Sequence, residues 1–399
     1  MPELLTFEEA QARVLEHTRP LEVETVALER AAGRVLAEPA RAVVDLPPFQ
    51  SSAMDGFAVR AADVPGTLAV VDEAAAGLPS ARTLGAGEAI AISTGGVVPT
   101  GADSVVPIEY VVLHDNVVQI DDGVEAGAHV RPRGGDVAAG DVVVGAGARL
   151  GAAQLGGLAA AGVAELRCAR IPCVAVLSTG TELARPGEPL GDGQVYEANA
   201  VMLAAALAAA GALTEVLPAV ADDESALRAA VERGLAADVL VSSGGVSVGP
   251  HDLVRRIEAE LGVEEVFWRV AIKPGKPVSF GVRGPTLVFG LPGNPVSSLV
   301  GCELFVKPAL RALQGRVEPL PRFEPGTLAA PLRRNDARDD FVRARSRLDQ
   351  NGWVLEPLSG QESHMIARAA AADAVVHVPR GAGELAAGAA VRWLPLGAA

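Results

Sequence analysis

The sequence predicts a multidomain α/β protein: a central parallel-sheet α/β domain, a helical N-terminal part, an inserted β-rich domain and a C-terminal β-barrel. Between residues 169 and 315, apolar strand patterns alternate with amphipathic helix patterns, which is typical of a parallel sheet with right-handed crossovers. Short valine-rich runs between Gly, Pro and Asp fill residues 42–140. Residues 316–399 again show short β-like runs between turns, which favours a small barrel.

The N-terminal part is predicted to be helical and discontinuous. Thr6 precedes Phe7 and two glutamates, and an amphipathic pattern continues from there to Pro20, which breaks it. A second helix is expected over 26–36. Residues 141–168 also have a helical composition, so we expect them to pack on residues 1–41 as one domain.

The central α/β domain is expected to span residues 169–315. Its predicted elements follow from apolar runs, caps and periodicity. In chain order they are a strand over 173–178, a helix over 199–210, a strand over 213–220, a helix over 223–235, a strand over 238–243, a helix opened by Asp252, strands over 266–272 and 286–291, and a helix from Val296 towards Leu310.

The loop after strand 238–243 is predicted to bind an anion. Glycines let backbone N–H groups approach an anion closely, and serine hydroxyls add further donors. Asp252 places a carboxylate beside this loop, and Mg²⁺ bridging that carboxylate and a phosphate would fit. The residues concerned are Ser243, Gly244, Gly245, Ser247 and Gly249.

Two further loops offer anion ligands. Strand 266–272 ends in Lys273-Pro-Gly-Lys276-Pro, where stiff backbone brings two cations together. A surface turn is the alternative, but the chain carries a net charge of −15, so two clustered cations need a reason. Strand 286–291 ends in Pro292, Gly293, Asn294 and Pro295, and Asn294 with Pro295 suits the start of a helix whose N-terminus attracts anions.

Composition excludes several classes of function. The chain has 399 residues, of which 49% are apolar and 21% charged, as in ordinary globular proteins. A pI near 4.9 without a basic face disfavours nucleic acid. The longest apolar run, residues 200–213, is too short to cross a membrane. No secretion signal opens the sequence, so a cytoplasmic protein is expected.

Metal and cofactor motifs of common enzymes are missing from the sequence. The three cysteines lack Cys-x-x-Cys spacing, and the six histidines form no zinc pattern. The α/β region contains neither a P-loop nor a Gly-x-Gly-x-x-Gly fingerprint, which disfavours an ordinary NTPase or a dehydrogenase.

Three motifs together resemble a known family. They are Ser-Gly-Gly-Val-Ser-Val-Gly at 243–249 followed by Asp252, Lys-Pro-Gly-Lys-Pro at 273–277, and Leu-Pro-Gly-Asn-Pro-Val-Ser at 291–297. Their order and spacing resemble the bacterial molybdopterin molybdenumtransferase (MoeA) family, which is similar to the E domain of gephyrin. The resemblance implies a central domain of the molybdenum-cofactor-binding type. The glycine-serine motif alone also occurs in related adenylyltransferases.

The β-rich domain carries further parts of the resemblance. Residues 52–58 and 94–103 match family loops, except that Phe57 replaces tyrosine and Gly96 replaces alanine. Thr181, in the central domain, replaces a family aspartate, and Tyr196-Glu-Ala-Asn199 resembles the next family element. In the family, the positions of Asp55, Thr94 and Asp136 face the central domain of the other subunit. The resemblance therefore implies a homodimer with shared sites.

The resemblance also implies a reaction. The enzyme would take adenylated molybdopterin and molybdate, release AMP in a Mg²⁺-dependent step, and leave molybdenum on the dithiolene. Catalytic roles are implied for Asp252, Glu182, Asp55, Asp136 and Thr94, and Mg²⁺ ligation for Asp252, Glu182 and Asp222. Substrate contacts are implied for Lys273, Lys276, Ser243, Gly244, Gly245, Ser247, Gly249, Pro292, Asn294, Pro295, Ser297, Arg343 and Ser363.

Other interpretations remain open. Without the resemblance, Asp55 and Glu182 are also compatible with turn residues, and Arg343 with a surface position. The same central fold could adenylylate molybdopterin with ATP, although the extra β-domains and the Pro-Gly-Asn-Pro loop speak against this. A dimeric scaffold is a further alternative. The sequence does not distinguish molybdate from tungstate.

Overall fold

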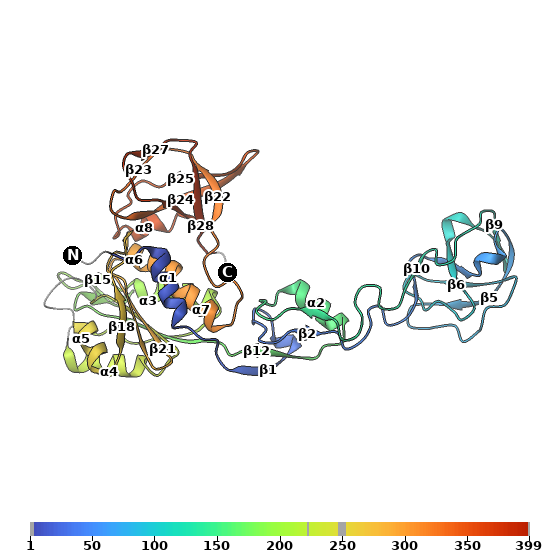
Figure 1. The fold of residues 1–399 in the computed structure, drawn as a ribbon, viewed down its shortest axis with the longest axis horizontal. Helices are drawn as coiled ribbons and strands as arrows, with labels where there is room; N and C mark the ends of the chain where they lie inside the picture. The colour runs from blue at the N-terminus through green and yellow to red at the C-terminus, as the bar shows by residue number, and fades with distance from the viewer. Residues whose placement is uncertain (1–3, 222, 246–252, 398–399) are drawn as a thin grey trace.

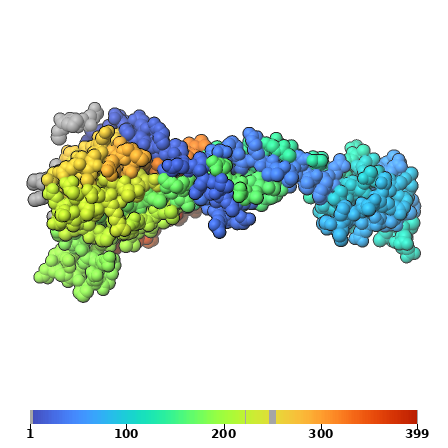
Figure 2. Space-filling view, turned by 90° about the horizontal axis from the view of Figure 1, so that it is seen from below, coloured from blue at the N-terminus to red at the C-terminus, as the bar shows by residue number. Residues whose placement is uncertain are grey.

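The structure is a computed structural model that describes residues 4–221, 223–245 and 253–397. The molecule is elongated (Figure 1). The central domain and the barrel form one end, and the β-rich domain forms the other. Between them lie the small N-terminal domain and an arm, which consists of the two chain segments that join the N-terminal domain to the β-rich domain. Figure 2 shows the central domain, the N-terminal domain and the β-rich domain as successive lobes. No helix within the described ranges is long and apolar enough to cross a membrane.

The central domain is built on a six-stranded mixed sheet. Its order is β16-β13-β17-β21-β20-β18, and the first four strands are parallel. Nearly continuous apolar runs form the inner strands because both sheet faces are covered. The strands are β16 (Leu213–Val216), β13 (Cys173–Ser178), β17 (Val239–Ser243), β21 (Thr286–Leu291), β20 (Ser279–Arg283) and β18 (Glu264–Trp268).

The expectation of an all-parallel sheet is wrong at one edge. β20 runs antiparallel to both β21 and β18. Arg283 pairs with Thr286, so only Gly284 and Pro285 connect β20 to β21, and a two-residue connection can join only antiparallel strands. The strand predicted over 266–272 is divided: its first part lies in β18, and Ile272 belongs to β19 (Ile272–Lys273) in a different sheet.

Helices cover both faces of the central sheet. Alternate residues of β13 face opposite sides, so Val174 and Val176 join one apolar cluster while Ala175 and Leu177 join another. α1, α3, α6 and α7 contribute to the first cluster, and α4 and α5 to the second. Their bounds are α1 (Phe7–Glu16), α3 (Asn199–Ala209), α4 (Glu224–Gly234), α5 (Leu253–Glu260), α6 (Pro295–Gly301) and α7 (Lys307–Leu313), with a π-helical turn, Cys302–Val306, between the last two.

The N-terminal region has less helix than predicted. α1 begins after Thr6, whose side chain forms a capping box with Glu9, and Gln11 donates to the carbonyl of Leu304 at 2.8 Å. The helix expected over 26–36 is wrong: β1 (Val23–Ala27) pairs antiparallel with β12 (Glu165–Ala169), and a 3₁₀ turn, Leu28–Arg30, follows. β-branched Val23, Thr25 and Val26 favour the strand.

Residues 141–168 are also only partly helical. They contain β11 (Val142–Val144), α2 (Ala152–Ala160) and the start of β12. Their apolar side chains pack with those of residues 26–40 in a separate small cluster, which includes Leu36, Leu150 and Leu158. This N-terminal domain connects the central domain with the arm (Figure 1).

The β-rich domain is a six-stranded sheet of order β7-β4-β6-β5-β9-β8. Two short strand pairs, β2 with β11 and β3 with β10, lead into it. Its elements are β2 (Ala40–Arg41), β3 (Ser51–Ser52), β4 (Gly56–Val59), β5 (Gly66–Ala74), β6 (Glu88–Ile92), β7 (Ser104–Pro107), β8 (Val112–His114), β9 (Val117–Ile120), β10 (Val130–Arg131) and the 3₁₀ turns Ala61–Asp63 and Ile108–Tyr110.

The predicted C-terminal barrel is confirmed. Its strands follow the order β24-β25-β22-β28-β26, and β24 also pairs with β26, which closes the ring. The central-domain strand β19 adds to β24 in parallel register. The elements are β22 (Glu324–Leu328), β23 (Leu332–Arg333), β24 (Asp339–Asp349), β25 (Gly352–Pro357), α8 (Ile366–Ala369), β26 (Ala374–Val378), β27 (Glu384–Leu385) and β28 (Ala390–Pro395).

Gly56→Ala is expected to destabilise the β-rich domain. A Cβ at this position would overlap the carbonyl oxygen of Val106 on the neighbouring strand, and overpacking of this kind costs about 1–3 kcal/mol. Gly156→Ala in α2 is the matched control, because its Cβ would meet nothing within 4 Å and alanine favours helix. Urea unfolding measures both variants. Equal stability of Gly56→Ala and the wild type would contradict the close approach of Gly56 to the Val106 carbonyl.

Candidate functional site

A cleft of about 760 Å³ lies at the carboxyl ends of β13, β17 and β21. Open α/β sheets hold ligands at this edge, where rigid strands position variable loops. All three predicted loops contribute to the cleft, together with a segment from the barrel. Its described lining consists of Ser178, Thr179, Gly180, Glu182, Leu183, residues 195–199, residues 243–245, Pro277, residues 292–295, His364 and Ile366.

The glycine pair after β17 allows two loops to pack closely. Gly244 and Gly245 have φ values of +99° and +66°. A Cβ on Gly244 would lie 2.5 Å from the carbonyl oxygen of Thr179, and one on Gly245 would overlap Val254. These positions therefore require glycine for close approach. Ser247 and Gly249, predicted in the same loop, lie outside the described residues.

The hydroxyl of Ser243 joins loops of the protein. It accepts a hydrogen bond from Asn199 Nδ2 at 2.8 Å and lies 3.3 Å from the Ser298 hydroxyl and 3.4 Å from the Pro292 carbonyl oxygen. Its side chain is buried. Ser298 donates its own proton to the Pro292 carbonyl, so Ser243 uses its proton and one acceptor site within the protein. Ser243 therefore fixes the distance between β17 and the loop after β21.

Glu197 and Asn199 were not among the predicted site residues. Glu197 accepts from the Ser178 hydroxyl at 2.8 Å and from the backbone N–H of Ala200 at 2.7 Å, which holds the start of α3 against β13. Asn199 also donates to the carbonyl of Gly293 at 2.7 Å. Both side chains are buried and both line the cleft. The signal for them was the Tyr196-Glu-Ala-Asn199 motif, whose family counterpart lies on the nucleotide side and which leads into an alanine-rich helix.

The predicted helix start at Asn294 and Pro295 is confirmed as the start of α6. The Asn294 side chain makes no capping hydrogen bond to the helix. Instead, the N–H of Val296 donates to the carbonyl of Ser363 at 3.1 Å. A barrel segment therefore satisfies one of the free N–H groups at this helix terminus.

Arg343 has a different environment from that expected of a direct oxyanion ligand. It is 1% exposed, and burial lowers its pKa. Its guanidinium donates to the carbonyls of Met365 at 2.8 Å, Gly360 at 2.7 Å and Glu362 at 3.2 Å. These bonds hold the 360–365 loop, whose Ser363 contacts α6. The buried Arg343 side chain thus holds this loop in position.

In the lysine loop, Lys273 lies between the central domain and the barrel. Lys273 Nζ is 3.3 Å from Asp340 Oδ2, and burial raises the pKa of Asp340 while Lys273 opposes that rise. A Cβ on Gly275 would lie 3.4 Å from the carbonyl oxygen of buried Ser297, so the loop runs beside α6. Among the described lining residues, the cleft receives Pro277 from this loop and neither lysine.

Lysine use in the chain is selective. The sequence contains only three lysines against 31 arginines, and two of the lysines are Lys273 and Lys276. The third, Lys307, is buried and bonds to Glu303 at 2.6 Å. Lysine presents a compact charge with rotatable donors, whereas arginine presents a fixed fork. The loop thus has the chemistry suited to a small, nearly spherical anion.

The predicted metal ligands are only partly described. Glu182 lines the cleft, and a Cβ on Gly180 would lie 2.5 Å from its Oε2, so the carboxylate lies against the loop backbone. Asp222 and Asp252 lie outside the described residues. Among the residues that the structure does describe, no group of three His, Cys, Asp or Glu side chains could hold a metal ion. Mg²⁺ is commonly bound by one or two carboxylates together with substrate phosphates, so a group of three is not required of the protein alone.

The predicted residues of the β-rich domain form their own polar group. Asp55 Oδ1 accepts from the backbone N–H of Thr94 at 2.6 Å and from its hydroxyl at 2.9 Å, and these bonds lower the pKa of Asp55. Asp136 is exposed nearer the N-terminal domain, where its N–H donates to Leu46. The β-rich domain lies at the opposite end of the arm from the cleft (Figure 1). One chain therefore does not bring Asp55 and Thr94 to the cleft.

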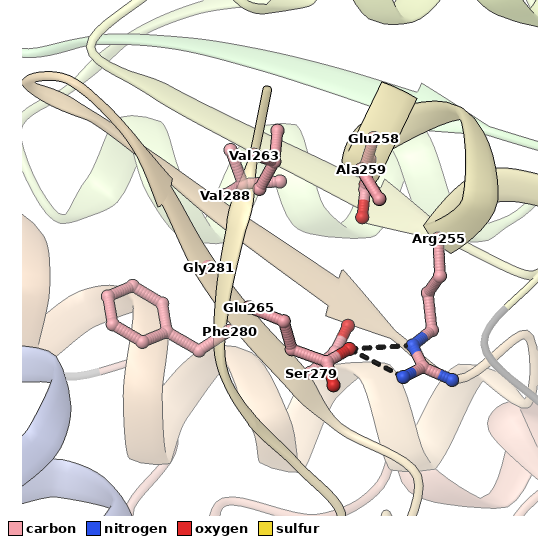
Figure 3. Close-up of a pocket in the computed structure, with 9 residues that line it drawn as sticks. All are labelled: Arg255, Glu258, Ala259, Val263, Glu265, Ser279, Phe280, Gly281 and Val288. Atoms are coloured by element: carbon pink, nitrogen blue, oxygen red, sulfur yellow. Dashed lines mark hydrogen bonds and ion pairs between the residues drawn. The ribbon is translucent and has the colours of Figure 1, made fainter. Parts of the chain in front are cut away.

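A smaller hollow of about 210 Å³ lies between α5 and strands β18 and β20 (Figure 3). Arg255 donates from Nε and Nη2 to Glu265 Oε2 at 2.9 and 2.6 Å across it. The Arg255 guanidinium also lies 4.1 Å from the ring centre of Trp268. None of the described residues that line this hollow is a predicted site residue, so the site is assigned to the larger cleft.

Comparison with known proteins covers nearly the whole chain. Three family models match: the MoeA N-terminal region (domain I and II) over residues 5–162, a probable molybdopterin binding domain over 175–312, and the MoeA C-terminal region (domain IV) over 325–396. Molybdopterin molybdenumtransferase 2 of Mycobacterium tuberculosis is 37% identical, covering 96% of this chain and 97% of that protein. The Haemophilus influenzae molybdopterin molybdenumtransferase is 33% identical, with 98% of each chain covered.

Solved structures show the same similarity. A crystal structure of the molybdopterin biosynthesis MoeA protein from Pyrococcus horikoshii has a TM-score of 0.85 and 26% identity, covering 99% of this chain and 100% of that one. Another Pyrococcus MoeA structure has a TM-score of 0.83 and 32% identity, covering 98% and 99%. The similarity therefore extends through the arm, the central domain and the barrel.

Replacement of Arg343 by Ala is expected to destabilise the protein by about 2–4 kcal/mol, because three carbonyls lose a charged donor in a buried position. Gln361→Ala should loosen the same loop without removing a charge, since Gln361 Nε2 bonds to the carbonyls of Arg343 and Leu358 at 2.9 and 2.7 Å. Both variants should increase hydrogen exchange in residues 360–365, measured by mass spectrometry. Arg345→Ala, on the exposed side of β24, is the control.

The alternative outcome is specific. If Arg343 does not hold this loop, Arg343→Ala will leave its hydrogen exchange unchanged while Gln361→Ala increases it. Such a result would remove the positioning role of Arg343.

Proposed function

Because the chain belongs to the MoeA family of molybdopterin molybdenumtransferases, we propose that it inserts molybdenum from molybdate into adenylated molybdopterin with release of AMP. It is a transferase of molybdenum cofactor biosynthesis. The observation that carries the finer proposal is the cleft at the strand ends, where a glycine-rich loop, a helix N-terminus and a barrel segment meet.

The substrate is proposed to lie along the cleft. Backbone N–H groups around Gly244 and Gly245 bind its phosphates, as close backbone approach at glycines allows, and Ser247 and Gly249 extend this loop beyond the described residues. The edge formed by Pro292, Asn294 and Pro295 borders the same space. Ser243 contributes by holding the two loops at a fixed separation.

Molybdate is proposed to bind where the lysine loop meets the barrel. Lys273 and Lys276 supply positive charge, and Ser297 and Ser363 supply donors, with Arg343 holding the Ser363 loop in place. The pairing of Lys273 with Asp340 supports this location, because it fixes the first lysine between the two domains. An oxyanion bound here would lie near the nucleotide cleft, because α6 borders both the lysine loop and the cleft.

Mg²⁺ is proposed to be held by Glu182 together with Asp222 and Asp252. Hard carboxylate oxygens are suitable ligands, and the ion when bound would neutralise charge on the pyrophosphate. The position of Glu182 in the lining of the cleft supports its part in this set. The Glu182 carboxylate lies against the Gly180 backbone, so it is directed along the loop after β13.

A homodimer with shared sites is proposed to complete the centre. Asp55, Thr94 and Asp136 would come from the β-rich domain of a second copy, because the arm keeps that domain away from the cleft of its own chain (Figure 1). The lowered pKa of Asp55 favours an ionised carboxylate at neutral pH. Asp55 would therefore contribute negative charge or ligation, whereas a general acid would need a protonated carboxyl.

AMP release tests the reaction. Purified protein mixed with adenylated molybdopterin, Mg²⁺ and molybdate should release AMP, and omission of molybdate or Mg²⁺ should abolish it. Consumption of ATP in the presence of molybdopterin, with no AMP released from the adenylated substrate, would instead identify an adenylyltransferase. Asp252→Ala should stop AMP release and leave the circular dichroism spectrum unchanged; retained activity would remove its assignment.

Lys276→Ala should raise the molybdate concentration needed for half-maximal AMP release by about 10- to 100-fold, since a hydrogen bond to a charged partner contributes about 1.5–3 kcal/mol. The requirement for adenylated molybdopterin should change little. The matched control is Arg347→Ala, an exposed cation on the barrel. An equal increase for both substrates would place Lys276 in general substrate binding.

A further inference from the structure

A second large cleft, of about 660 Å³, lies where the N-terminal domain, the C-terminal end of α7 and the barrel meet. It shares no described lining residue with the proposed catalytic cleft. Its walls are residues 145–149, the connection from α7 to the barrel, and the end of β28. α7 lies between the barrel and the N-terminal domain in Figure 1.

Two walls of this cleft are in direct contact. A Cβ on Gly147 would lie 2.5 Å from Val317 Cγ2 and 3.0 Å from the carbonyl oxygen of Gly315. Gly147 has a φ of +75°, so its conformation and its surroundings both require glycine. The contact brings the segment of Arg149 against the segment of Arg316.

Four arginines line the cleft, and one of them, Arg322, pairs with Glu324. Among the residues that the structure describes, the other three converge on it without such a partner. Arg149, Arg311 and Arg316 all line it, in a chain whose net charge is −15. Within the described ranges, none of the three forms an ion pair with a carboxylate. The side chain of Arg311 makes only long contacts of 3.5 Å with the carbonyls of Pro319 and Leu320. A concentration of unpaired cations is unusual on an acidic protein.

The carboxylates of the cleft do not balance this charge. Glu303 is buried and bonds to Lys307 at 2.6 Å, and Glu324 lies 3.3 Å from Arg322. Glu318 is exposed to solvent. The C-terminus of α7 carries about half a negative charge, which is too little to offset three guanidinium groups.

Burial and mutual repulsion act on the arginines. Burial lowers the pKa of Arg311, Glu303 opposes this, and Arg149 adds to the lowering. Burial likewise lowers the pKa of Arg316, and both Arg311 and Arg149 add to it. Arginine remains charged in proteins, so the repulsion persists as a cost until an anion enters.

We propose that the cleft lined by Arg149, Arg311 and Arg316 is a second anion-binding site, which takes a phosphate-sized dianion either free or as the phosphate of a small metabolite. The planar forks of guanidinium groups match the oxygen spacing of a phosphate and form paired hydrogen bonds with it. A dianion would neutralise most of the excess charge. Binding would stabilise the junction of the three domains, because its ligands come from the N-terminal domain and from α7 and the segment after it.

Thermal unfolding of the full chain tests the site. At constant ionic strength in a chloride buffer, inorganic phosphate should raise the melting temperature of the wild type, since a ligand of the native state stabilises it. Without phosphate, Arg316→Ala should melt at the same temperature as the wild type or higher, because repulsion is relieved. Its phosphate affinity, measured by calorimetry, should be at least about tenfold weaker.

A second variant and a second probe complete the test. Arg149→Ala should repeat the result if Arg316→Ala does not fold, and Arg347→Ala, outside the cleft, should bind phosphate as the wild type does. Ribose 5-phosphate bound more tightly than inorganic phosphate would identify a phosphorylated metabolite. Equal or weaker binding of ribose 5-phosphate would identify the free anion.

Two results would overturn the proposal. If Arg316→Ala and Arg149→Ala melt at lower temperatures and keep the full phosphate response, these arginines only stabilise the junction. If the variants change the oligomeric state in sedimentation experiments without changing phosphate binding, the cluster belongs to a contact between chains.

Discussion

The docking of the barrel on the strand ends is the constraint on which the proposed site depends. The parallel pairing of β19 with β24 and the bond from Val296 N–H to the Ser363 carbonyl both cross this contact. Within the barrel, Arg343 holds residues 360–365 in place for it. The central sheet alone would leave the lysine loop and the start of α6 open to solvent. With the barrel in place, both Lys273 and the start of α6 contact a second domain.

Charge screening explains how a chain with a negative net charge can offer anion-binding sites. Exposed charges more than about 8 Å apart are largely screened at physiological salt, so a bound anion responds to its immediate neighbours and hardly to the net charge of the chain. The lysine loop and the arginine cleft are both local exceptions in an acidic protein. They differ in chemistry, since one offers compact ammonium groups and the other planar forks.

Local patterns predicted the elements that depend on local forces. β13 and β21 agree with their predicted ranges. Uninterrupted apolar runs bounded by Gly, Pro and polar residues leave little choice of where each strand begins and ends. The start of α1 follows from the capping box at Thr6. The strand β20 was missed because its Ser, Gly and Arg positions weaken the apolar pattern, and pairing with β21 provides what the sequence lacks. The environment of Arg343 could not be predicted, because its three carbonyl partners lie 17 to 22 residues away in a loop without regular structure.

The arm imposes a final condition on the chemistry. Thr94 donates twice to Asp55 and thereby keeps that exposed carboxylate ionised, an arrangement that a simple turn would not need. Within its own chain, the β-rich domain is held away from the cleft (Figure 1). The homodimer proposed above would bring this preorganised carboxylate to the cleft of a second copy.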